Sequence, residues 1–312
     1  MFLVNHTEVT EFMLLGFRSH HILTLVLFVL FLVIYILTLV ENLMIIILVA
    51  NVPSLKSPMY VFLTQLSTSD ILLTTNIVPN TLHVIINEGS TISVTGCITQ
   101  FYIHCVLTAA ECFLLTVMSY DRYLAICRPL HYTSVMHLRL QLQLIILCWL
   151  SAFIVILPIV LLMNNLDFCG PHIIDHYFCD LAPVLELSCS DSTIVELVDF
   201  SLGIPFLLSP FFFILFTYIY IFITIIGISG TIGRQKAFST CSSHLIVVCT
   251  YYGTLIMVYM FPSNGQTSND SKIMSILYTM GTSFVNPIIY SLKNKEIMKN
   301  LLKYLTNIRK KN

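Results

Sequence analysis

Long runs of apolar residues alternate with short polar segments along almost the whole chain. Seven of the apolar stretches hold about 20 residues or more, the length that a helix needs to cross roughly 30 Å of hydrocarbon. Their approximate limits are 22–50, 59–82, 98–122, 140–163, 193–226, 238–261 and 272–292. The pattern therefore predicts an all-α membrane protein, a bundle of seven transmembrane helices.

The basic residues predict how this bundle is oriented, because Lys and Arg collect in the cytoplasmic loops of membrane proteins. Thirteen of the 15 Lys and Arg residues fall on the side of the C-terminus, and only Arg18 and Lys272 fall on the other. We therefore expect an extracellular N-terminal tail (1–21), a domain of seven transmembrane helices (22–292) and a cytoplasmic segment (293–312). In that last segment Ile297, Leu301, Leu302 and Leu305 share one helical face, as in an amphipathic helix on the inner leaflet.

Composition supports the same reading. The chain is 57% hydrophobic and 10% charged, against roughly 25% charged residues in a soluble domain, and its mean hydropathy is +0.88. These values exclude an ordinary cytosolic enzyme. The net charge of −1 gives no basic field that could hold nucleic acid. The lipid bilayer is the expected surrounding.

Four cysteines fall on the predicted outer side: Cys97, Cys169, Cys179 and Cys189. An even set in an oxidising compartment predicts disulfides, and the sequence leaves all three pairings open. The outer tail also contains the sequon Asn5-His6-Thr7, which predicts a glycan on Asn5. A second sequon at Asn269 is too close to the membrane for modification.

Three acidic residues fall inside predicted spans, where ionisable groups are costly and are functional candidates. They are Glu41, Asp70 and Glu111. Asp70 and Glu111 lie at similar depth on adjacent spans, so their carboxylates would repel unless one is protonated or a cation lies between them. The sequence does not distinguish a bound sodium ion from a proton shared by the two carboxyl groups. No other cofactor is expected. Glu41 receives no role.

Several short sequence motifs occur along the chain in an order that is typical of one protein family. They are EFMLLGF (11–17), SPMYVFLTQLSTSD (57–70), MSYDRYLAIC (118–127) running into RPLHY (128–132), HYFCD (176–180), KAFSTCSSHL (236–245) and NPIIYSLKNKEI (286–297). In this order the chain resembles the olfactory (odorant) receptors of the rhodopsin-like G-protein-coupled class. It departs from the usual family pattern at Glu41, where the family has Gly, at Lys56, where it has His, and at Ser119, where it has Ala.

The resemblance implies a ligand pocket within the helix bundle. Helical phase and the family alignment assign it these residues: His104, Cys105, Thr108, Ala109, Cys112, Leu202, Gly203, Phe206, Tyr252, Leu255, Ile256, Tyr259, Ile276 and Thr279. Amine receptors of the wider class place an Asp seven residues after the outer cysteine of helix three, where this chain has His104. We therefore expect a small, neutral, mostly apolar volatile ligand.

The resemblance also implies a heterotrimeric G-protein partner of the stimulatory, olfactory type, a cyclic-AMP signal, and a multi-pass place in the plasma membrane of olfactory cilia. The implied switch residues are Asp121, Arg122, Tyr123, Pro210, Tyr218, Lys236, His244, Asn286, Pro287 and Tyr290. Asn286 and Pro287 are expected to break the hydrogen-bond ladder of helix seven, and Pro210 that of helix five. The implied disulfides are Cys97–Cys179 and Cys169–Cys189, with Cys97–Cys189 as the alternative.

The alternative functions are a transporter or channel, a metabolite receptor of the same fold and an enzyme. A transporter or channel would also carry intramembrane acids, but the internal repeats typical of transporters are absent from the sequence. A receptor of the same fold could sense a metabolite in a non-olfactory tissue, and the sequence does not separate this from olfaction. An enzyme is disfavoured because the sequence shows neither a nucleophile–base–acid set nor a metal-ligand spacing.

Overall fold

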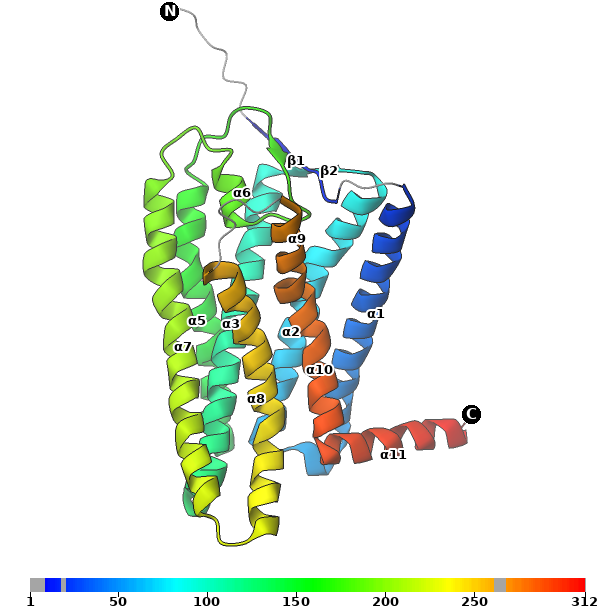
Figure 1. The fold of residues 1–312 in the computed structure, drawn as a ribbon, viewed down its shortest axis with the longest axis vertical. Helices are drawn as coiled ribbons and strands as arrows, with labels where there is room; N and C mark the ends of the chain where they lie inside the picture. The colour runs from blue at the N-terminus through cyan, green and yellow to red at the C-terminus, as the bar shows by residue number, and fades with distance from the viewer. Residues whose placement is uncertain (1–8, 18–20, 261–267, 312) are drawn as a thin grey trace, which may run out of the picture.

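The computed structural model describes residues 9–17, 21–260 and 268–311. Its long helices are α1 (His21–Asn51), α2 (Pro58–Ile86), α3 (Val94–Cys127), α5 (Leu138–Met163), α7 (Thr193–Gly227) and α8 (Thr231–Met260). A seventh rod runs without a break through α9 (Ser268–Ile276), the π-helical turn η3 (Leu277–Gly281) and α10 (Thr282–Lys293). Figure 1 shows these rods side by side, with α11 (Lys295–Lys311) turned away from the bundle at its C-terminal end.

Within the described ranges, four helices are long and apolar enough to cross a membrane: α1, α3, α5 and α7. Many apolar side chains of α1, such as Leu25 and Val29, are exposed, whereas most of α3 is buried. The α2 helix carries buried Ser69, Asp70 and Thr74 among its apolar residues. Polar residues of this kind lower the hydropathy of a helix while they face neighbouring helices rather than lipid.

The helices extend beyond the predicted spans at several ends. The α3 helix continues to Cys127 where the pattern predicted 122, and α8 begins at Thr231 rather than at 238. Hydrophobicity marks the part of a helix that lies in hydrocarbon, and the backbone ladder can continue into water beyond it. The α11 helix occupies the predicted cytoplasmic segment. Ile297 and Leu301 pack against the bundle core, and Leu302 is exposed.

The helix prolines do not end their helices. The α10 helix continues through Pro287, and α7 continues through Pro210. The irregular part of the seventh rod lies earlier, at the π-helical turn Leu277–Gly281. Helix prolines are tolerated in membranes when neighbouring groups satisfy the freed backbone carbonyls.

The extracellular end carries a small sheet in the order β2-β1-β3. The N-terminal strand β1 (Glu11–Leu14) pairs antiparallel with β2 (Ser90–Ser93) and parallel with β3 (Ile173–Ile174). Its side chains alternate, so Phe12 and Leu14 are buried beneath the sheet. Gly16 follows at φ +61°, and a Cβ there would lie 2.6 Å from Val84. Only glycine fits this bend without strain.

The remaining short elements lie in the loops: η1 (Pro53–Leu55), η2 (Pro129–His131) and α4 (Tyr132–Val135) on the cytoplasmic side, and α6 (Leu181–Leu185) on the extracellular side.

Candidate functional site

The predicted ligand residues lie on helices that face one another in the outer half of the bundle. Six are buried: His104, Ala109, Cys112, Tyr252, Leu255 and Thr279. Six are half-buried: Cys105, Thr108, Leu202, Phe206, Ile256 and Ile276. Gly203 is exposed, and the side chain of Tyr259 lies outside the described residues.

Side-chain contacts join the helices that carry these residues. Phe206 of α7 packs edge-on against Phe113 of α3, with ring centroids 4.5 Å apart. The Tyr251 hydroxyl of α8 donates to the backbone carbonyl of Thr108 at 2.7 Å. The Cys112 thiol contacts the same hydroxyl at 3.5 Å. The structure therefore brings α3, α7 and α8 together around the predicted site.

His104 lies at the outer end of this region. Its ring contacts Phe178 and Tyr278, with centroids 5.5 and 5.6 Å away. Its Nδ1 atom is buried and has no hydrogen-bond partner among the described residues. A buried polar atom in this state costs about 1–3 kcal/mol unless water or a ligand reaches it. His104 therefore offers a polar contact within a largely apolar surrounding.

The outer loop closes over His104. A disulfide between Cys97 and Cys179, with Cα atoms 5.4 Å apart, ties this loop to the start of α3. The Cys179 amide also donates to the Gln100 side-chain oxygen at 3.0 Å. A second disulfide, Cys169–Cys189, lies within the loop. Residues 175–180 therefore form a lid, which we call the loop lid.

Side-chain polar contacts join the loop lid to α9 and to the π-helical turn. The Lys272 ammonium group, whose side chain is 2% exposed, pairs with Asp175 at 2.6 Å. The Tyr177 hydroxyl lies 3.3 Å from the Thr279 hydroxyl in the π-helical turn, and the Tyr278 hydroxyl donates to Asp180 at 3.2 Å. Tyr177 and Tyr278 were not among the predicted ligand residues, although the HYFCD string marked the loop.

His176 of the loop lid is buried between rings. It stacks on Tyr177 at 4.7 Å, and its Nε2 atom lies 3.3 Å from the Ser275 hydroxyl of α9. Burial lowers the pKa of His176 to about 4, and nearby Asp180 opposes this only in part. The imidazole is therefore neutral at physiological pH.

The two membrane carboxyl groups lie deeper in the bundle. Asp70 and Glu111 are fully buried and close enough to interact electrostatically. The Asn286 side chain donates to Asp70 at 3.5 Å. Both Glu111 oxygens lack a hydrogen-bond partner among the described residues, and nearby Ser69 donates instead to the Leu107 carbonyl. The carboxyl oxygens of Asp70 and Glu111 can act as ligands of a hard cation such as sodium. Alternatively, the two carboxyl groups can share one proton.

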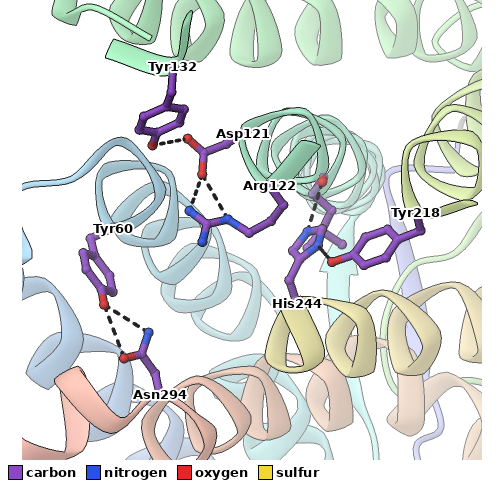
Figure 2. A network of polar contacts seen from close by, with 8 residues as sticks. Tyr60, Asp121, Arg122, Tyr132, Tyr218, His244 and Asn294 are labelled. Carbon is purple, nitrogen blue, oxygen red and sulfur yellow. Dashed lines mark hydrogen bonds and ion pairs between the residues drawn. The ribbon is translucent and has the colours of Figure 1, made fainter. Parts of the chain in front are cut away.

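At the cytosolic end of α3, Asp121 uses both carboxylate oxygens. One oxygen accepts from Arg122, through Nε at 3.1 Å and also through Nη2, and the other accepts from the Tyr132 hydroxyl at 2.8 Å. Figure 2 shows the three side chains together. Burial and the Asp121 carboxylate raise the pKa of Tyr132 well above its usual range, so the hydroxyl stays a donor. Tyr132 belongs to the RPLHY string but was not among the predicted switch residues.

A second contact joins α3, α7 and α8 nearby (Figure 2). The Tyr218 hydroxyl lies 2.7 Å from His244 Nδ1, and His244 Nε2 lies 3.1 Å from the Leu115 carbonyl. His244 is fully buried, as are Tyr290 and Asn286 of α10. Tyr123 is half-buried, and its ring packs edge-on against Tyr220. The side chain of Lys236 and the whole of Asn5 lie outside the described residues.

Comparison with known proteins identifies the family. The sequence profile of the olfactory receptor family matches residues 31–308. Human olfactory receptor 10A7 is 43% identical over 293 residues, which cover 94% of this chain and 93% of the relative. Human olfactory receptor 11A1 is 43% identical over 95% of this chain and 94% of its own length. Mouse olfactory receptor 5P55 is 41% identical over 97% and 98%.

These matches extend over nearly all of the chain, so they cover the bundle, the loop lid and the cytosolic network together. Family membership implies odorant sensing, G-protein coupling and a cyclic-AMP signal, with no enzymatic activity. The chain therefore belongs to the olfactory receptor family, the seven-helix membrane receptors of the G-protein-coupled class.

Proposed function

We propose that this receptor binds a small, neutral, mostly apolar volatile molecule between α3, α7, α8 and the π-helical turn. The observation that carries the proposal is the position of His104, which lies beneath the loop lid with a buried and unpartnered Nδ1 atom. The surrounding candidates are largely apolar, thiol or hydroxyl side chains such as Leu255, Cys112 and Thr108. One or two hydrogen bonds and dispersion would hold such a ligand.

The test is a panel of volatile compounds applied to cells that express the receptor with an olfactory-type stimulatory G protein. Cyclic AMP is the readout. A responding neutral compound should lose potency in His104→Leu, which keeps the bulk but removes the ring nitrogens. His83→Leu, at an exposed position on α2, is the matched control. Responses confined to charged amines would contradict the neutral-ligand proposal.

We further propose that Arg122 is held by Asp121 at rest and meets the C-terminus of the G protein when α8 moves outward. The contact between Tyr218 and His244 supports this, because it joins α7 and α8 next to α3 in the resting arrangement. We assign six further residues to the same switch: Tyr123, Pro210, Lys236, Asn286, Pro287 and Tyr290.

Leu130 adds an apolar contact for this partner. It lies in η2, between α3 and the Tyr132 that bonds Asp121, and it is 91% exposed. Burial of this side chain against a partner would remove its apolar surface from water, which is favourable. We assign it to the G-protein interface.

We also propose an occupant of the membrane carboxyl pair, a modification of the outer tail and a site of action. Asp70 and Glu111 hold either a sodium ion or one shared proton in the resting bundle, and the unpartnered oxygens of Glu111 support such an occupant. Asn5 carries a glycan in the outer tail.

The receptor functions in the cilia of olfactory neurons. Detection of its transcript only in another tissue would favour a metabolite sensor of the same fold.

A further inference from the structure

The corner between α10 and α11 is held by Tyr60, at the cytosolic start of α2. Its hydroxyl accepts a hydrogen bond from Asn294 Nδ2 at 3.1 Å and donates to a Glu296 carboxylate oxygen at 3.2 Å. The ring is 6% exposed, so packing fixes its direction. Figure 2 shows Tyr60 and Asn294 facing each other. One hydroxyl thus connects α2 to the residues on both sides of the start of α11.

Asn294 in turn caps α11. Its side-chain oxygen accepts from the backbone amides of Glu296 at 3.0 Å and Ile297 at 3.2 Å. The first amides of a helix have no partner within the helix, so a capping side chain fixes where the helix begins. The same oxygen also lies 3.3 Å from the Tyr60 hydroxyl, so this hydroxyl contacts both polar atoms of the capping side chain.

Beyond the cap, α11 is held mainly by apolar packing. Ile297 is buried in the bundle core, and Leu301 packs against it. The Asn300 side chain reaches the Ser54 hydroxyl of the η1 turn only at 3.5 Å. Within the described residues, the Tyr60 hydroxyl therefore accounts for most of the polar attachment between α2 and the start of α11.

This corner borders the cytosolic network around Arg122. Tyr60 and Arg122 are close enough to interact electrostatically, and both lie in the region drawn in Figure 2. A G-protein segment that reached Arg122 would meet the capped end of α11 beside it. The direction of α11 therefore shapes one side of that docking region.

We propose that Tyr60 is a positioning residue for G-protein coupling, which acts through Asn294 to fix the direction of α11 beside Arg122. The inference rests on the proposed coupling through Arg122. It needs the hydroxyl and not only the ring, because the hydroxyl supplies a donor and an acceptor at once.

The experiment compares Tyr60→Phe with wild type in purified receptor reconstituted in nanodiscs, without ligand. Hydrogen exchange of the Glu296 and Ile297 amides should become about fivefold faster, since one ordinary hydrogen bond contributes about that factor. Basal guanine-nucleotide exchange on a purified stimulatory G protein should need a higher G-protein concentration for its half-maximal rate. Tyr35→Phe is the matched control, because its hydroxyl contacts Thr75 between α1 and α2 at an exposed position.

A second variant tests the route. Asn294→Ala should reproduce both effects, and adding Tyr60→Phe to it should cause no further change if the hydroxyl acts through Asn294. Unchanged amide exchange in Tyr60→Phe would overturn the positioning role, and so would an unchanged half-maximal G-protein concentration. Equal nucleotide exchange by wild type and Arg122→Ala would instead reject the coupling proposal, a result that the amide measurement does not depend on.

Discussion

Asn42 of α1 donates a hydrogen bond to the backbone carbonyl of Ser283 in α10 at 3.3 Å. In a regular helix this carbonyl would accept from residue 287, four positions later, but Pro287 has no amide hydrogen. The α1 side chain therefore replaces the missing donor, and α10 continues through the proline. Asn42 is fully buried, and the same amide group also bonds the Thr38 carbonyl.

Asn42→Ala should destabilise the bundle by about 1–3 kcal/mol, because it leaves a buried carbonyl without a partner. The measurement is the thermal unfolding midpoint of purified receptor in detergent. Asn51→Ala is the control, since Asn51 bonds a carbonyl of its own helix at an exposed position. Equal midpoints for the two variants would show that the Ser283 carbonyl finds another donor.

Arg122→Ala should abolish the cyclic-AMP response to any activating odorant, because Arg122 is proposed to meet the G protein and makes no contact with the ligand region. Cell-surface receptor must be equal to wild type by antibody labelling of the tail. Arg139→Ala, at an exposed cytoplasmic position, should respond normally. An intact response in Arg122→Ala would remove Arg122 from the coupling mechanism.

The loop lid should lose stability as the pH falls. Burial holds the pKa of folded His176 at about 4, below its ordinary value of about 6.5. The unfolded state therefore binds the proton first, and the contribution present above pH 6.5 is lost as the pH falls toward 4. At pH 5 the loss is about 2 kcal/mol.

Thermal midpoints at pH 7 and pH 5 check this expectation. His176→Asn should show a smaller difference between the two, while His83→Asn, whose imidazole is exposed, should behave as wild type. Asp175, Asp180 and Lys272 also face His176, so the comparison is made between variants at each pH. The same pH dependence in His176→Asn and wild type would exclude this histidine as its source.

Raising sodium at constant ionic strength should weaken agonist potency if Asp70 and Glu111 hold the ion in the resting state, because a species that binds one state shifts the equilibrium toward it. Glu111→Gln, which keeps the shape but removes a charge, should reduce this dependence. Titrations in sodium and in a large organic cation make the comparison. Identical wild-type curves in both salts, with potency that follows pH, would support the shared proton.

Peptide mapping under non-reducing conditions should find Cys97 joined to Cys179 and Cys169 joined to Cys189. Cys97→Ser should reduce surface expression more than Cys169→Ser, because it frees the loop lid from α3 whereas the other bond lies within the loop. A free Cys97 thiol in functional receptor would contradict this arrangement.

The sequence by itself determined the helices and their environment. Apolar runs of sufficient length define membrane helices wherever they occur, because lipid leaves the backbone few alternatives. The positions of Lys and Arg predicted the orientation, and the ordered strings predicted the family that the comparisons confirm. Each of these signals is local, so it can be read without knowing which helices touch.

Only the tertiary structure decided the contacts between distant segments. Because Pro287 has no amide hydrogen, the sequence alone predicts a missing hydrogen bond in α10. The donor that replaces it comes from Asn42, 241 residues away from Ser283. Tyr177 and Tyr60 gave no sequence signal of their own, since an aromatic residue in an apolar segment is most often core. Their roles depend on Thr279 and Asn294, which the packing of the bundle brings within hydrogen-bond distance.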